Sequence, residues 1–283
     1  MPDGRRPEQV PFAVEPISGL ELAGDSAGDG VPLVLAHGLT ATRRNVLQGS
    51  RHLLTRGVRL IGYDARGHGE SSPAPDPGAY EYADLSADLG AVADELGLDR
   101  FALAGSSMGA ATAVRFALEH RDRVSALILI TPAYLSARRL GADSLAHWDR
   151  LAEALEAGDV DAFVERTRVA DLPERWREPA RLATRQRIER HRNLAAVARA
   201  VRVVPRSVAF GDLGELGTLG MPTLVVATRD AADPGHPLAV AERYAGAIPR
   251  AQLVVEDEGA TPLAWQGARL SHAVGDFLEG LQP

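Results

Sequence analysis

The chain has 283 residues, of which 45% are hydrophobic, and it carries a formal net charge of −7. This length and apolar content suffice for one large α/β domain, with or without an inserted segment. The acidic balance, with a pI near 5.6, gives nucleic-acid binding no electrostatic support. Because the chain has no cysteine, disulfides, thiolate catalysis and thiolate metal sites are excluded.

The first residues, MPDGRRPEQVPF, contain no apolar run of signal-peptide length. No later segment approaches the ~20 consecutive apolar residues that a membrane-spanning helix requires. We therefore expect a soluble cytoplasmic protein without a membrane partner.

Six short, β-branched and almost continuously apolar runs predict strands that are buried on both faces of a parallel sheet. They are 31–36, 58–64, 100–105, 124–130, 223–228 and 251–256. Helical patterns alternate with them, at 42–56, 81–97, 108–120, 237–247 and 266–279. This alternation predicts a doubly wound, mostly parallel α/β sheet, to which residues 12–24 add an antiparallel edge hairpin.

The alternation stops between residues 134 and about 206, where the sequence has helical spacing and no strand-like run. This stretch is too long for a simple connection in a compact sheet. We interpret 134–206 as a helical cap inserted into an α/β core of residues 1–133 and 207–283. The cap would cover the carboxyl ends of the strands, where open α/β sheets bind their ligands.

Arginines interleaved with Glu and Asp are numerous in the predicted cap, and a charged helix surface is the default explanation. One or two of them facing the site would bind an acidic substrate, but the sequence does not identify which. They are Arg138, Arg139, Arg166, Arg168, Arg175, Arg177, Arg181, Arg185, Arg187, Arg190, Arg192 and Arg199.

The strongest local motif is G-x-S-x-G at residues 105–109, with Ser107 at its centre. The motif follows a predicted buried strand and opens a helical run, as a nucleophile elbow requires. The alternative is a small-residue turn whose serine has no catalytic role.

Upstream, His37-Gly38 follows another strand, so the backbone N–H groups of Leu39 and Met108 are candidates for an oxyanion hole. We interpret His37, and His68 in the turn at 62–72, as structural.

These motifs, together with D-x-R-G-H-G-x-S from Asp64 to Ser71, resemble those of the α/β-hydrolase superfamily, in its esterase, lactonase and C–C hydrolase branch. The resemblance covers the chain in order, including the inserted cap. It implies a serine nucleophile rather than the aspartate of epoxide hydrolases and haloalkane dehalogenases. It also implies an acid after the next-to-last strand. Asp233 and Asp230 both lie there, and we favour Asp233 because D-P-x-H-P resembles the acid loop of the family.

The family also has a histidine after its last strand, and here the sequence departs from it. Residues 259–262 read Gly-Ala-Thr-Pro, without a histidine. A serine hydroxyl is a weak nucleophile unless a base takes its proton. His236, on the loop that carries Asp233, is the tentative replacement, oriented by Asp233 or by Glu256, Asp257 or Glu258. The cap histidines His147 and His191 are weaker alternatives.

Three functions remain open on this evidence. The first is a serine hydrolase that acts on an ester, lactone or other activated acyl bond with an atypical base. The second is a catalytically silent or very slow relative that binds a small ligand under the cap, and the third is a non-hydrolytic lyase. All three imply a small-molecule ligand. The sequence contains no metal-ligand cluster and no phosphate-binding motif, so we expect no cofactor.

Overall fold

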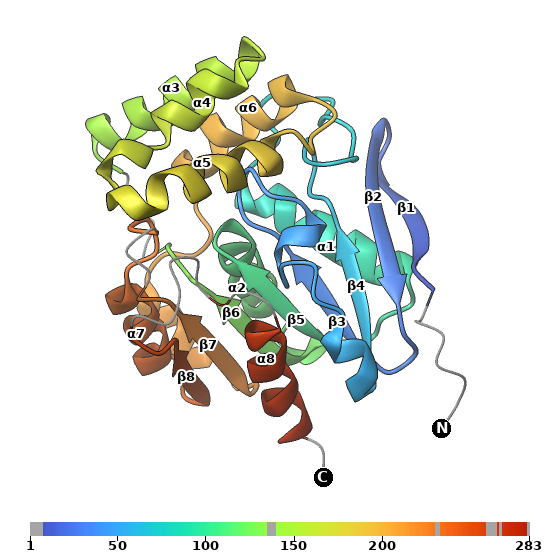
Figure 1. The fold of residues 1–283 in the computed structure, drawn as a ribbon. Helices are drawn as coiled ribbons and strands as arrows, with labels where there is room; N and C mark the ends of the chain where they lie inside the picture. The colour runs from blue at the N-terminus through green and yellow to red at the C-terminus, as the bar shows by residue number, and fades with distance from the viewer. Residues whose placement is uncertain (1–7, 135–139, 230–232, 259–264, 266–267, 282–283) are drawn as a thin grey trace.

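The structure is a computed structural model that describes residues 8–134, 140–229, 233–258, 265 and 268–281. Its centre is an eight-stranded sheet with the order β1-β2-β4-β3-β5-β6-β7-β8 (Figure 1). The strands are β1 (Val10–Ile17), β2 (Leu20–Ala27), β3 (Val31–Ala36), β4 (Val58–Tyr63), β5 (Phe101–Ser106), β6 (Val124–Ile130), β7 (Thr223–Ala227) and β8 (Ala251–Val255).

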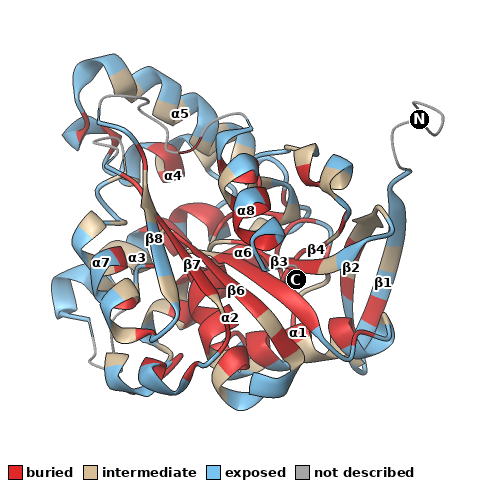
Figure 2. Cartoon of the chain, turned by 90° about the horizontal axis from the view of Figure 1, so that it is seen from below, coloured by how far each residue is buried: buried red, intermediate tan, exposed pale blue. Residues whose placement is uncertain are grey.

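The six strands β3 to β8 pair in parallel, and β1 and β2 form an antiparallel hairpin that joins the sheet edge at β4. The predicted sheet class, strand positions and edge hairpin are therefore confirmed. Helices cover both faces of the sheet, and Figure 2 shows the buried interior running along β6 and β7. Because these strands are covered on both faces, their sequences are continuously apolar rather than alternating.

The helices around the sheet are α1 (Tyr82–Glu95), α2 (Met108–Glu119), α7 (Leu238–Ala247) and α8 (Arg269–Glu279). Short 3₁₀ turns connect other elements: η1 (Arg43–Asn45), η2 (His52–Arg56), η3 (Arg121–Arg123), η4 (Val169–Asp171), η5 (Val204–Arg206) and η6 (Leu213–Thr218). No helix in the described ranges is both long and apolar enough to cross a membrane.

The prediction of one helix over 42–56 was wrong. Two 3₁₀ turns, η1 and η2, occupy its ends. Between them Gln48 and Gly49 have φ angles of 50° and 73°, which lie in the left-handed region. A residue with positive φ interrupts a right-handed helix, so the apolar spacing of this segment did not produce a continuous helix.

The two faces of the sheet form separate apolar cores. One core gathers α1, α2 and α7 through side chains such as Leu89, Val114 and Tyr244. In the other core, α8 and η2 pack against the sheet through Leu270 and Leu53. Successive strand residues alternate between the cores, as the pleat requires. The sheet is thereby held from both sides, and its carboxyl ends are fixed in place.

Four further helices form a cluster beyond the carboxyl ends of the strands (Figure 1). They are α3 (Ala142–Glu156), α4 (Val160–Arg166), α5 (Glu174–Ile188) and α6 (Leu194–Val203). The cluster has its own core, which includes Leu151, Phe163, Ile188 and Val197. Leu39 packs against both this core and the core of α1, α2 and α7. The loop after β3 therefore lies where the helical cluster meets the sheet.

Two glycines permit the close packing of α2 against the strands. A Cβ on Gly109 would overlap the carbonyl oxygen of Ala36, and a Cβ on Gly105 would overlap that of Gly109. The obstacles are backbone atoms, which cannot move aside as a flexible side chain can. Glycine at both positions is thus a packing requirement of the strand-to-helix turn.

We predict that Gly109→Ala destabilises the fold by about 2–4 kcal/mol, because α2 must move away from β3. Gly90→Ala is the matched control, since the added Cβ on α1 would meet only ordinary contact at 3.6 Å from the Phe116 ring. That control should be neutral or stabilising by about 0.5–1 kcal/mol. Urea unfolding of both variants measures the difference, and equal midpoints would contradict the packing argument.

Candidate functional site

Ser107 lies at the sharp turn between β5 and α2. Its backbone has φ 52° and ψ −110°, an unfavourable conformation for a residue with a Cβ. Its N–H donates to the carbonyl of Ile130 at 3.1 Å, which ties the turn to the end of β6. The conformation raises the serine above the carboxyl end of the sheet, where it precedes the N-terminus of α2. Such a strained strand-to-helix turn is the geometry of a nucleophile elbow.

The hydroxyl of Ser107 lies 2.8 Å from Nε2 of His236. Nδ1 of His236 lies 2.8 Å from both carboxylate oxygens of Asp233. The ionised carboxylate can only accept, so Nδ1 carries the proton and Nε2 accepts from the serine hydroxyl. The structure therefore brings three of the predicted site residues into one hydrogen-bonded chain, in the sequence order serine, acid, histidine.

The loop after β7 carries both the carboxylate and the imidazole. The N–H of His236 donates to the carbonyl of Asp233 at 3.3 Å, so the two side chains share one tight turn. Pro237 follows, and α7 begins at Leu238. In the sheet, β7 is two strands from β5, or about 10 Å, whereas β8 is three strands away. A histidine on this loop is consequently well placed to contact Ser107.

The alternative in which a carboxylate from 256–258 orients His236 was wrong, because Asp233 holds that imidazole. Glu256 is buried and accepts from the Thr228 hydroxyl at 2.9 Å and from the N–H of Arg229 at 3.0 Å. Asp257 and Glu258 are exposed. Glu256 thus connects the end of β8 to the beginning of the loop that carries Asp233.

The environment of Asp233 favours its ionised form. Burial acts to raise the pKa of its carboxyl group, but the hydrogen bond and charge of His236, together with the charge of Arg187, outweigh burial and lower it. The side chains of Asp233 and His236 are 39% and 22% exposed. A carboxylate that stays ionised can hold the imidazole in one tautomer and stabilise its protonated form.

The loop with His37 and Gly38 lies directly against the elbow, since a Cβ on Gly38 would be 3.5 Å from the Cβ of Ser107. The N–H groups of Leu39 and Met108 flank this contact. In the described ranges, neither donates to a backbone carbonyl outside the regular elements. The N–H of Met108 begins α2 and has no intrahelical acceptor.

The alternative acid Asp230, and the segment 259–262 where the family has its histidine, lie outside the described residues.

His191 is buried at the junction of the helical cluster and the sheet. Its Nδ1 accepts from the N–H of Gly69 at 2.8 Å, and its Nε2 donates to the carbonyl of Thr40 at 3.0 Å. Both ring nitrogens are thereby engaged away from Ser107. Within the described residues, His147 makes no hydrogen bond to Ser107 either, and its ring contacts Trp148. Neither histidine competes with His236 for the serine.

His37 and His68 occupy structural positions. Nε2 of His37 accepts from the N–H of Ala65 at 2.9 Å, and its Nδ1 donates to the carbonyl of Gly38 at 2.8 Å. Nδ1 of His68 lies 3.0 Å from the carbonyl of Arg66. Over the described part of the chain, no group of three or more His, Asp or Glu side chains is arranged to hold a metal ion.

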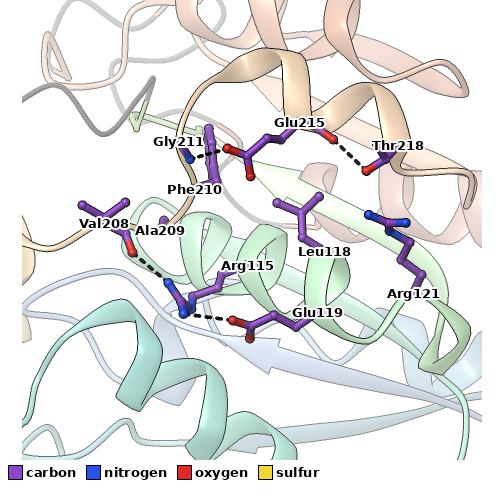
Figure 3. Close-up of a pocket in the computed structure, with 10 residues that line it drawn as sticks. All are labelled: Arg115, Leu118, Glu119, Arg121, Val208, Ala209, Phe210, Gly211, Glu215 and Thr218. Carbon is purple, nitrogen blue, oxygen red and sulfur yellow. Dashed lines mark hydrogen bonds and ion pairs between the residues drawn. The ribbon is translucent and has the colours of Figure 1, made fainter.

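A surface hollow of about 420 Å³ lies at the far end of α2 (Figure 3). Arg115 pairs there with Glu119 and donates to the carbonyl of Val208, while Glu215 accepts from the N–H of Gly211. Nε of Arg115 is buried and has no hydrogen-bond partner among the described residues. Because Arg115 lies eight residues beyond Ser107 on the helix, about 12 Å along its axis, the hollow is separate from the serine site.

Residues 31–268 match the model of the family described as alpha/beta hydrolase fold. The match spans most of the chain, which therefore belongs to this family. Its region includes the elbow, the Asp233–His236 turn and the helical cluster. The resemblance on the three sequence motifs is confirmed at the level of the family.

Curated relatives and solved structures agree with this assignment. The AB hydrolase superfamily protein YisY of Bacillus subtilis is 36% identical over 38% of this chain and 40% of its own length. The first curated relatives are matched over about two fifths of their length. A thermophilic esterase from Thermogutta terrifontis, with malate bound, is 29% identical at a TM-score of 0.76, over 98% of this chain and 100% of its own. An enol-lactonase from Burkholderia xenovorans shares the fold at 23% identity and TM-score 0.73, over 94% and 99%.

We predict that acid weakens the fold through His191. Burial is the main cause that lowers the pKa of His191, to about 4, against 6.5 in an unfolded chain. Between these values the unfolded chain binds more protons, so this stability is complete above pH 6.5 and is lost as pH falls towards 4. The loss is about 2 kcal/mol between pH 7 and pH 5.

His191→Asn keeps an acceptor for the Gly69 N–H but has no titrating group. Urea unfolding at pH 7 and pH 5 should show a smaller loss in this variant than in the wild type. Measurements at pH 7 and pH 8, where His191 is neutral in both states, provide the control. An identical loss between pH 7 and pH 5 in both proteins would contradict the prediction.

Proposed function

We propose that this chain is a serine hydrolase acting on an ester, a lactone or another activated acyl bond of a small molecule. Ser107 is the nucleophile, His236 the general base and Asp233 the carboxylate that orients it. The observation that carries the proposal is the continuous hydrogen-bonded chain from Ser107 through His236 to Asp233, each contact at 2.8 Å. In this scheme the base sits on the loop after β7 rather than on the loop after the last strand.

Acylation follows from this geometry. The Ser107 oxygen attacks the carbonyl carbon of the substrate while its proton passes to Nε2 of His236. The resulting oxyanion accepts hydrogen bonds from the N–H groups of Leu39 and Met108. The intermediate collapses, the bond to the leaving oxygen breaks, and that oxygen takes the proton from Nε2. The products are an acyl-enzyme on Ser107 and a free alcohol, or the opened alcohol end of a lactone.

Deacylation repeats these steps with water. A water molecule gives a proton to Nε2 and attacks the acyl carbon, and the second oxyanion is held by the same two N–H groups. Its collapse breaks the bond to Ser107, whose oxygen recovers the proton from His236. The carboxylic acid is released and the site returns to its starting state. Every proton in the cycle is carried by His236, and Asp233 stabilises the imidazolium in both halves.

Two further features support an acyl substrate. The Thermogutta terrifontis protein, matched along its full length at 29% identity, is an esterase. In addition, the helical cluster α3–α6 lies beyond the strand ends that carry Ser107 (Figure 1), where a cap would restrict access to a small molecule.

The two alternative functions, a catalytically silent binder and a lyase, differ from a hydrolase in what they require of the site. The silent-binder hypothesis was motivated by a missing base, and a histidine nitrogen 2.8 Å from the serine hydroxyl removes that motive. A lyase would use the same oxyanion donors without a covalent intermediate. Trapping of an acyl-enzyme on Ser107 therefore separates a hydrolase from a lyase.

We predict rapid, stoichiometric labelling of Ser107 by a fluorophosphonate, because His236 activates its hydroxyl. Ser107→Ala should abolish the adduct, and His236→Ala should reduce ester turnover by about 10⁴–10⁶. His272→Ala, at an exposed position on α8, is the matched histidine control and should leave turnover unchanged. Mass spectrometry locates the adduct. Labelling and turnover that survive in His236→Ala would eliminate His236 as the base.

We predict that Asp233→Asn lowers kcat by about 10⁴, because an amide cannot stabilise the imidazolium. Asp230→Asn tests the alternative acid on the same loop and should change kcat by less than about threefold if Asp233 is the acid. Steady-state kinetics on one activated ester compares the two variants. If Asp230→Asn produced the larger loss, the assignment would be reversed.

A further inference from the structure

Arg187, in the last turn of α5, has a cationic side chain with no partner in the described part of the chain. Its Nε is inaccessible to solvent and has no hydrogen-bond partner. Within the described residues, the guanidinium forms no ion pair and no other hydrogen bond. The neighbouring Arg185 on the same helix behaves differently, since it is more exposed and pairs with Asp161 across the cluster surface.

The position of Arg187 relates it to the serine site. The next residue, Ile188, is fully buried in the core of the helical cluster. His191 follows one turn later and contacts Thr40 on the loop that carries Leu39. The guanidinium also lies within electrostatic range of Asp233, since each group affects the pKa of the other.

A cation in this environment is costly. Desolvation is the main cause that lowers the pKa of Arg187, and the charge of Asp233 offsets it only in part. Among the described residues Asp233 forms no ion pair with Arg187, and both of its carboxylate oxygens lie 2.8 Å from Nδ1 of His236. Arg187 is intermediate in exposure, and its Nε is both inaccessible to solvent and unpaired. A partly buried cation without a partner destabilises the fold unless it is compensated. A ligand that carries an anion would supply the missing partner.

We infer that Arg187 is the specificity residue for a substrate that bears a carboxylate on the acyl side of the scissile bond. The planar guanidinium donates two parallel hydrogen bonds to a carboxylate, which a neutral acyl chain cannot accept. This inference rests on the proposed function for the reaction, and it adds the substrate class: monoesters or lactones whose acyl part carries a second, free carboxylate.

The test uses p-nitrophenyl monoesters of straight-chain dicarboxylic acids with four to eight carbons. Each is compared with the p-nitrophenyl ester of the fatty acid with the same number of carbons. The wild type should show a higher kcat/KM for at least one carboxylate-bearing ester than for its neutral counterpart. Arg187→Gln should lower kcat/KM for that ester by about 10- to 100-fold more than it lowers kcat/KM for the neutral ester.

Arg185→Gln is the matched control, because it removes an arginine from the same helix that pairs with the cluster itself. It should leave the ratio of the two kcat/KM values unchanged. An equal loss on both esters in Arg187→Gln would overturn the inference, since it would mean that Arg187 only supports Asp233. A wild type without preference for the carboxylate would also overturn it.

A binding measurement separates this inference from the hydrolase proposal. Calorimetry with the Ser107→Ala variant should show that the free dicarboxylate of the preferred length binds at least about tenfold more tightly than the fatty acid of equal length. The double variant with Ser107→Ala and Arg187→Gln should bind the two acids with equal affinity. If the wild type hydrolyses no ester but this difference is found, the inference stands and the hydrolase proposal fails. Equal binding of both acids would overturn the inference whatever the activity.

Discussion

The hydrogen bond between His236 and Ser107 is the contact on which the proposed function depends, and it requires three constraints at once. The strained backbone of Ser107 must present its hydroxyl above the sheet. The turn from Asp233 to His236 must hold acid and base on a single loop. The order β5-β6-β7 must bring that loop within reach of the elbow. None of the three suffices without the others.

The surrounding structure supports this contact from several directions. Gly105 and Gly109 allow α2 to pack closely against β3 and β5, which fixes the direction of the elbow. Glu256, at the end of β8, holds the beginning of the acid–base loop through Thr228 and Arg229. His191 joins the helical cluster to the loop beside the elbow. Packing and buried hydrogen bonds therefore limit the movement of the groups around Ser107, as a preorganised site requires.

The charges of Asp233 and Arg187 connect the proposed catalytic contact with the proposed selection of the substrate. Asp233 is needed as an anion to hold His236, and Arg187 helps to keep it ionised. Among the described residues the same arginine has no close partner of its own, so in the proposed scheme one cation would affect the oriented acid and also bind the carboxylate of the ligand. In this scheme Arg187 on the helical cluster would select the substrate. Ser107 at the end of β5 would cleave it.

Much of the fold is determined by local sequence patterns. Continuous apolar runs predicted the six parallel strands, and helical spacing predicted α1, α2, α7 and α8, because buried strands and amphipathic helices have different periods. The G-x-S-x-G motif predicted the position of the elbow at Ser107. The helix expected over 42–56 failed, since spacing does not reveal that Gln48 and Gly49 take positive φ angles.

The sequence by itself determined that Ser107 had candidate partners in Asp233 and His236 and that residues 259–262 contain no histidine. Only the tertiary structure decided that His236 contacts Ser107, that Asp233 rather than Glu256 holds its imidazole, and that Nε of Arg187 is buried without a partner among the described residues. The physical reason is that these contacts join residues far apart in the chain, such as Ser107 and His236, which are 129 positions apart. Their distance is set by the strand order β5-β6-β7, which leaves no local pattern in the sequence.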